Sequence, residues 1–346
     1  MKTTVDMGSI STFQTMLQAS SQDGHLYLWQ WPDLNAEPQK VKVGLWWPRR
    51  ELSTPPLNLG STLISSSAQV IYASHEDDDT TIVLRSINRD HESKRWSLGR
   101  EWWCERLRNT NNGRFVAICL QELFTYFLKD ESRNDYGRYR FGIIDCQADE
   151  IQWISTIYRW LRLPIISSVS VSGDGQYLAA VGTKNGGFIH LADVANKRVL
   201  WEKVPLGEEV PHGDWTVNFN DVSFSPDSNY VYVAGNCGLF CFDTATGKIL
   251  SQWQTASRLV SVSISTDGRL VAGGTVATGF VYIWEAKTGK LVLKLLTGQH
   301  SIYGLAFSPD STLLATSGVP KSNIKIWEMP PADSQGAKPQ QSVNAE

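Results

Sequence analysis

The sequence lacks several features that would assign a protein to a class at once. Its 346 residues contain no apolar run as long as a membrane helix, and the opening MKTTVDMGSIST has no apolar core of a signal peptide. The formal net charge is only −3, which gives no electrostatic reason to expect nucleic acid or an acidic membrane as a partner. These absences predict a cytoplasmic protein without membrane insertion.

Cysteine is scarce and odd in number. The five cysteines fall within predicted strands or turns, at Cys104, Cys119, Cys146, Cys237 and Cys241. This pattern predicts buried thiols in a reducing compartment and not a disulfide framework. The close pair Cys237 and Cys241 has no second pair to complete a structural zinc site.

Familiar catalytic motifs are also absent. There is no Gly-x-Ser-x-Gly elbow and no Walker loop, and GDGQYLAAVG at 173–182 is better explained as a turn of a repeat than as a dinucleotide fingerprint. Helical periodicity is rare, while alternating, β-branched and aromatic runs separated by turn residues dominate. The sequence predicts an all-β protein that is not an enzyme and needs no cofactor or metal.

What the chain does contain is a phrase repeated four times in its second half. The copies are SVSVSGDGQYLAAVG (168–182), DVSFSPDSNYVYVAG (221–235), SVSISTDGRLVAGGT (261–275) and GLAFSPDSTLLATSG (304–318). Each predicts a strand, a tight turn and a second strand, and a third strand then ends in an acid. Those acids are Asp193, Asp243, Glu285 and Glu328, spaced 50, 42 and 43 residues apart. Such a period is typical of a four-stranded unit that recurs.

Counting back from the clear copies predicts seven units, although six or eight remain open. Four-stranded antiparallel sheets that stack radially into a closed ring form a β-propeller, and we expect a seven-bladed one over residues 1–329. The stretch 330–346 is rich in Pro, Gln, Ser and Gly and is predicted to be a disordered tail. The last unit then lacks a fourth strand, which we expect residues 2–6 to supply.

These motifs resemble the WD40 repeat family. YIWEAKTGK (282–290) and IKIWE (324–328) match its strand-ending Trp-acid pair, and GQHSIYGLAFSPD (298–310) matches its Gly-His opening and Ser-Pro-Asp turn. The resemblance is good over 166–329 and weak over 1–160. It implies a propeller that serves as a scaffold for protein assemblies without catalysis. A PQQ-like or YVTN-like propeller is the alternative family, given KRVLWEKVPLG (197–207) and FDTATGKIL (242–250).

The polar network of that family is only partly represented. The network would link an Asp, a His, a Ser or Thr, and the Trp. The first unit offers no His beside Ser21, Asp23 and Trp29, and the seventh offers no acid beside His300, Ser317 and Trp327. We therefore expect the ring to rest mainly on apolar packing.

Long, aromatic and charged insertions fall on one predicted face. Loops between units and loops joining second to third strands must share a face, and these include segments 46–58, 75–80, 121–137, 159–164 and 206–216. Aromatic residues with Arg beside them are typical of interface hot spots. The predicted partner-binding residues are Trp46, Trp47, Arg49, Arg50, Asp77, Asp78, Phe124, Tyr126, Phe127, Trp160, Arg162 and Trp215.

The sequence thus predicts a non-catalytic scaffold or adaptor that binds a partner protein as a subunit of a multiprotein assembly. Two alternatives remain: a metal-dependent propeller enzyme of lactonase type, and a sensor domain of a larger protein. The enzyme would use candidates from four separate loops, namely His75, His212, Asp214 and His300. The acidic run at 76–79 could bind Ca²⁺, but a solvated turn or a contact for a basic partner explains it better.

Overall fold

The computed structural model is built entirely from strands and turns over its described residues. These residues are 7–13, 16–21, 25–30, 39–42, 62–64, 69–76, 79–86, 92–110, 113–122, 138–148, 150–158, 165–183, 187–203, 218–319 and 324–331. This part of the chain contains no helix, and so none with the length and hydropathy of a membrane span.

The strands form seven antiparallel sheets, six with four strands and one with three. The first sheet holds β1 Met7–Phe13, β2 Met16–Ser21, β3 His25–Gln30 and β4 Gln39–Lys42. The second holds β5 Thr62–Ile64, β6 Gln69–Glu76, β7 Asp79–Ser86 and β8 Glu92–Ser97. The third holds β9 Trp102–Asn109, β10 Phe115–Glu122, β11 Arg138–Asp145 and β12 Glu150–Tyr158. The fourth holds β13 Ile165–Val171, β14 Tyr177–Thr183, β15 Gly187–Asp193 and β16 Arg198–Lys203.

The remaining three sheets come from the second half of the chain. The fifth holds β17 Phe219–Phe224, β18 Tyr230–Gly235, β19 Gly238–Asp243 and β20 Ile249–Trp253. The sixth holds β21 Leu259–Ile264, β22 Leu270–Thr275, β23 Phe280–Glu285 and β24 Leu291–Leu296. The seventh holds β25 Ser301–Phe307, β26 Leu313–Val319 and β27 Ile324–Glu328.

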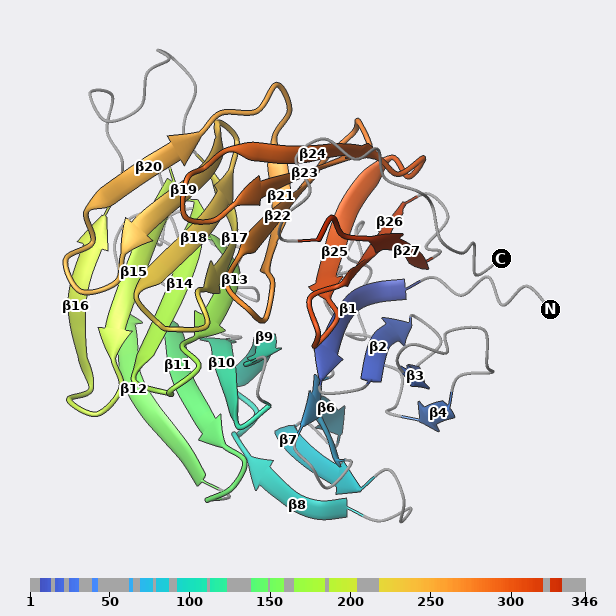
Figure 1. The fold of residues 1–346 in the computed structure, drawn as a ribbon. Helices are drawn as coiled ribbons and strands as arrows, with labels where there is room; N and C mark the ends of the chain where they lie inside the picture. Colours follow the sequence, from blue (N-terminus) through green and yellow to red (C-terminus); the bar gives the residue numbers. More distant parts are fainter. Residues whose placement is uncertain are drawn as a thin grey trace, which may run out of the picture.

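The sheets are arranged around a common axis (Figure 1). The first strand of each sheet lies nearest the centre and contacts the first strand of the next sheet, and β1 contacts β25 to close the circle. The all-β prediction and the propeller architecture are confirmed. The seventh sheet has three described strands, and residues 2–6 and 332–346 lie outside the described residues. The completion of that sheet to four strands therefore stays a prediction.

Apolar clusters fill the space between neighbouring sheets. Five clusters of buried residues join the second sheet to the third, and so on in order to the seventh. The cluster between the fourth and fifth sheets includes Phe219, Phe240 and Phe242, with Phe219 meeting both other rings edge-on. Because a strand in this position is covered on both faces, its apolar residues need not alternate. Apolar packing between sheets is as expected from the sequence.

The repeated phrase owes its form to one turn made four times. In the fifth sheet, the Ser225 hydroxyl donates to Asp227 at 2.5 Å and accepts from the backbone N–H of Tyr230 at 3.0 Å. The same two bonds recur in the fourth, sixth and seventh sheets, around Ser172 and Asp174, Ser265 and Asp267, and Ser308 and Asp310. Ser and Asp at this spacing satisfy backbone groups that the turn leaves unpaired.

The acids that end the third strands close the next turn. Asp243 accepts from the backbone N–H of Thr246 at 2.8 Å, and Asp193 accepts from that of Asn196 at 3.0 Å. The residue of positive φ in these turns is Gly247 in the fifth sheet, at 68°, and Lys197 in the fourth sheet, at 51°. The side chain of Asn196, which precedes Lys197, donates a hydrogen bond to Asp193.

The sequence prediction was also wrong about part of one insertion. Segment 75–80 was expected to be an irregular loop, yet β6 runs to Glu76 and β7 starts at Asp79, with these two residues paired. Asp79, a member of the acidic run, accepts a hydrogen bond from the backbone N–H of Gly99 at 2.9 Å. The prediction of buried thiols outside disulfides is confirmed for four of the five cysteines: none of the five forms a disulfide, four are buried, and Cys237 is half-buried.

Candidate functional site

The predicted partner-binding residues all lie outside the described residues. This holds for Trp46, Trp47, Arg49, Arg50, Asp77, Asp78, Phe124, Tyr126, Phe127, Trp160, Arg162 and Trp215. Their grouping on one face stays a prediction. The described strands nevertheless show after which residue several of their segments begin: Glu122 is the last residue of β10, Tyr158 of β12 and Lys203 of β16.

The described residues give no metal site made of the four candidates of the enzyme alternative. His212 and Asp214 lie outside the described residues, and nothing is described of the His75 side chain. His300 is exposed, with its Nδ1 3.2 Å from the Ser301 hydroxyl oxygen. Within the described parts of the chain, no three His, Cys, Asp or Glu residues gather as a metal site would require.

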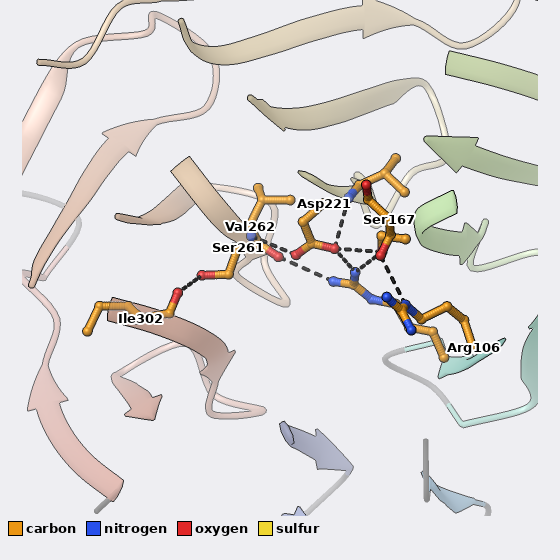
Figure 2. Close-up of polar contacts among 9 residues, drawn as sticks. Arg106, Ser167, Asp221, Ser261, Val262 and Ile302 are labelled. Atoms are coloured by element: carbon orange, nitrogen blue, oxygen red, sulfur yellow. Dashed lines mark hydrogen bonds and ion pairs between the residues drawn. The ribbon is translucent and has the colours of Figure 1, made fainter. Parts of the chain in front are cut away.

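The most elaborate polar arrangement of the described residues lies at the centre of the ring (Figure 2). We call it the axial network and define it as Arg106, Arg108, Ser168, Asp221 and Ser261. These residues come from the first strands β9, β13, β17 and β21. Figure 2 shows Asp221 between the strands that carry Ser167 and Val262.

Asp221 is the hub of the axial network. Its Oδ1 accepts from the guanidinium of Arg108 and, at 2.7 Å, from the hydroxyl of Ser168. The same carboxylate accepts from the backbone N–H groups of Val222 at 2.9 Å and Val262 at 2.8 Å. The Asp221 side chain is 14% exposed, so these four donors replace most of its water. A carboxylate that accepts hydrogen bonds from several strands holds those strands together.

The network extends to both sides of this hub. Arg106 donates from Nε to the carbonyl of Ser167 at 3.0 Å, which ties β9 to β13. Ser261 donates to the carbonyl of Ile302 at 2.7 Å, which ties β21 to β25. Five consecutive first strands are therefore linked by side chains.

The first strands β13, β17, β21 and β25 each contain a bulge near these bonds. The pairing with the second strand shifts at Ser167, Asn220, Val260 and Tyr303. The extra residue of a bulge does not pair with the neighbouring strand, so its backbone N–H and C=O groups can bond to other partners. The carbonyl of Ser167 is used by Arg106 in this way, and Asn220 itself donates to the carbonyl of Leu259 at 2.6 Å.

Sequence reasoning missed the axial network. The strand WWCERLRN at 102–109 was not identified, because its two Arg and one Glu interrupt the apolar alternation expected of a core strand. A signal was present in the aligned copies: Asp221 opens the second copy where Ser168 and Ser261 open the first and third. An acid at a position otherwise held by Ser requires a partner, and Arg108 provides it.

The family-like network of the seventh sheet exists, but with different members. Trp327 donates from Nε1 to the Thr316 hydroxyl at 3.1 Å, and Thr316 donates to the side-chain oxygen of Gln299 at 2.9 Å. Trp327 was expected, whereas Ser317 and His300 were wrong. Each true member precedes the predicted one by a single residue. Thr316 and Ser317 lie in strand β26, where that shift moves a side chain to the opposite face, whereas Gln299 and His300 precede β25.

Comparison with known proteins agrees with this geometry. Residues 289–328 match the family model described as WD domain, G-beta repeat. The chain is 24% identical over 157 residues to the uncharacterized WD repeat-containing protein sll1491 of Synechocystis, covering 45% of this chain and 42% of that protein.

Two eukaryotic relatives match shorter stretches. WD repeat and SOCS box-containing protein 1 of Homo sapiens is 26% identical over 43% of this chain and 36% of its own length. The guanine nucleotide-binding protein subunit beta of Arabidopsis thaliana is 33% identical over 31% of each chain. The chain thus spans less than half the length of these relatives. Together with the ring of sheets and the Trp-centred network, the matches show that the chain carries a WD40 repeat at 289–328 and is similar to WD-repeat proteins.

Proposed function

We propose that the chain is a non-catalytic adaptor that binds a partner protein through its loop-rich face, as a subunit of a multiprotein assembly in the cytoplasm. The observation that carries the proposal is the antiparallel strand order. In each of the six four-stranded sheets, the end of the second strand and the end of the fourth strand point to the same side. The segments with the predicted aromatic and Arg residues begin at those ends.

The opposite face is less suited to binding a partner. Its described turns in the second half of the chain are short, and their polar side chains already hydrogen-bond within the turn, as Ser225 does to Asp227 and Thr246 to Asp243. The centre is occupied too, since Asp221 has four donors. Binding capacity is therefore expected in the long segments, where large aromatic residues would otherwise be costly to leave in water.

The relatives support a role in assemblies. The printed name of one describes a subunit of a guanine nucleotide-binding protein, and that of another a protein with a SOCS box beside its WD repeats. The net charge of −3 favours a protein partner over nucleic acid. The axial network supports a non-enzymatic role, because its one carboxylate is committed to strand contacts.

The test is recovery of a native complex from the source cell with matched variants. One variant replaces Trp46, Trp47, Arg49 and Arg50 by Ala, and a second replaces Phe124, Tyr126 and Phe127. The control replaces Lys248 and Lys290, which lie in turns of the opposite face. We expect one partner to co-purify with the wild type and the control, and to fall at least tenfold with a loop variant. Full recovery with both loop variants would contradict the proposal, and turnover of a lactone panel would favour the enzyme alternative.

A further inference from the structure

Strand β24 is one of three outer strands with at most one charged residue, the others being β12 and β20. Its sequence LVLKLL contains one charged residue, Lys294. By contrast, β8 carries Lys94 and Arg95, and β16 carries Arg198, Glu202 and Lys203. Charged side chains on an outer strand keep it from pairing with strands of other molecules. Strand β24 lacks most of this protection.

The outward edge of β24 is open among the described residues. The strand is paired with β23 on one side and with no described strand on the other (Figure 1). The backbone N–H of Thr297 donates to the carbonyl of Gly279 at 2.9 Å. Since hydrogen-bonding direction alternates along a strand, Leu295 and Leu293 also face β23. The N–H and C=O groups of Lys294 and Leu296 therefore point away from the sheet.

Large apolar side chains accompany this open edge. Leu296 is 62% exposed, Leu291 45% and Val292 38%. No other strand has three of the large apolar side chains that stand out as exposed in the described residues. Lys294 does not interrupt the apolar surface, because its ammonium lies over the ring of Phe280, 4.2 Å from the centroid. Its charge is thereby drawn onto the sheet, over rings of β23.

We propose that β24 pairs edge to edge with β24 of a second copy of this chain, forming a closed two-fold dimer. A two-fold antiparallel pair must set outward-facing residues against each other. An axis through Leu295 places Lys294 opposite Leu296 of the second copy, and Leu296 opposite its Lys294. An axis through Lys294 would instead bring two like charges together. The axis through Leu295 pairs both outward-facing residues, Lys294 and Leu296. It covers Leu296, the most exposed leucine of the strand, with the aliphatic part of Lys294 from the second copy.

This surface is separate from the loop-rich face of the proposed function. A contact built on one six-residue strand is small compared with a standard protein interface. The dimer is therefore expected to form reversibly, with a monomer fraction that grows on dilution.

The experiment is sedimentation velocity of the full chain over a concentration series, with two matched substitutions. Leu296→Lys places a second cation opposite Lys294 twice in the dimer, whereas Leu296→Glu places an anion there. Both changes remove the same leucine, so loss of apolar area alone would affect them equally. We expect Leu296→Lys to weaken dimerisation about tenfold or more, and Leu296→Glu to retain it with a new dependence on salt.

Two further variants make the outcome decisive. Leu250→Lys changes an exposed leucine of β20, another outer strand, and should leave the dimer unchanged. The double variant Lys294→Glu with Leu296→Lys restores opposite charges and should recover dimerisation. A wild type that stays monomeric at every concentration overturns the proposal. Equal effects of Leu296→Lys and Leu296→Glu, or an equal effect of Leu250→Lys, would overturn it as well.

Discussion

Arg108 in the third sheet donates to Asp221 in the fifth, so a single ion pair connects two sheets that are not neighbours. Ser168 of the intervening fourth sheet bonds to both partners, at 3.1 Å from Arg108 and 2.7 Å from Asp221. The apolar clusters of this propeller join only consecutive sheets. The axial network therefore adds a connection between sheets that are not neighbours. Within it, the Asp221 carboxylate accepts four hydrogen bonds.

Asp221→Ala is expected to lower the free energy of unfolding by about 3 kcal/mol, because it leaves Arg108 and two backbone N–H groups without their acceptor. Arg108→Ala should cost less, about 1 kcal/mol, since that side chain is 30% exposed and the remaining donors still satisfy Asp221. Denaturant unfolding of both single variants and the double variant measures this. The double variant should be less destabilised than the two single effects added. Simple additivity would mean that the two side chains do not interact.

The turns between third and fourth strands predict that glycine is the more stable residue at two equivalent positions, 197 and 247. Lys197→Gly should raise the free energy of unfolding by about 0.5 kcal/mol, because the positive φ of 51° is costly for a side chain with a Cβ atom. Gly247→Ala should lower it by more than about 1 kcal/mol. An added Cβ there would lie 2.6 Å from a ring carbon of Trp201, which packs across from the fourth sheet. Thermal unfolding of both variants checks the contrast, and a destabilised Lys197→Gly would refute the conformational argument.

The network of the seventh sheet can be tested at Thr316, which is fully buried. Thr316→Val keeps the shape but removes the hydroxyl that accepts from Trp327 and donates to Gln299. We expect a loss of about 2 kcal/mol, since two buried polar groups lose their partner. Thr316→Ser keeps the hydroxyl and serves as the control for the polar effect. If Thr316→Val and Thr316→Ser are equally stable in denaturant unfolding, the hydrogen bonds contribute nothing.

The clear repeats and their local hydrogen bonds made most of the fold predictable, and contacts between residues far apart in the sequence were not predictable. The acids Asp193 and Asp243 marked the ends of third strands because each closes the following turn, a local role that recurs. The axial network depends on Arg108 meeting Asp221 across 113 residues of sequence, and no local pattern reports such a meeting. Ser317 was predicted in place of Thr316 because the one-residue register of β26 cannot be taken from a family motif alone, and His300 was predicted in place of Gln299 in the segment just before β25. The predicted loop residues, such as Trp46 and Phe124, lie in segments whose sequence has no repeat to align.

His190 provides the expected pH dependence. It lies in β15 with 5% of its surface exposed, its Nε2 is buried without a hydrogen-bond partner, and its Nδ1 is 3.5 Å from Glu202. Burial lowers the pKa of His190 below the usual 6.5, and the attraction of Glu202 only partly opposes this. The fold therefore favours the neutral ring. Its stabilisation is present above pH 6.5 and is lost as the pH falls below that value, by about 1 kcal/mol per pH unit until the folded-state pKa is reached. Unfolding measured from pH 7.5 to 5 should show this decline in the wild type and a flatter curve in His190→Gln. Parallel curves for the two proteins would assign the decline to other groups.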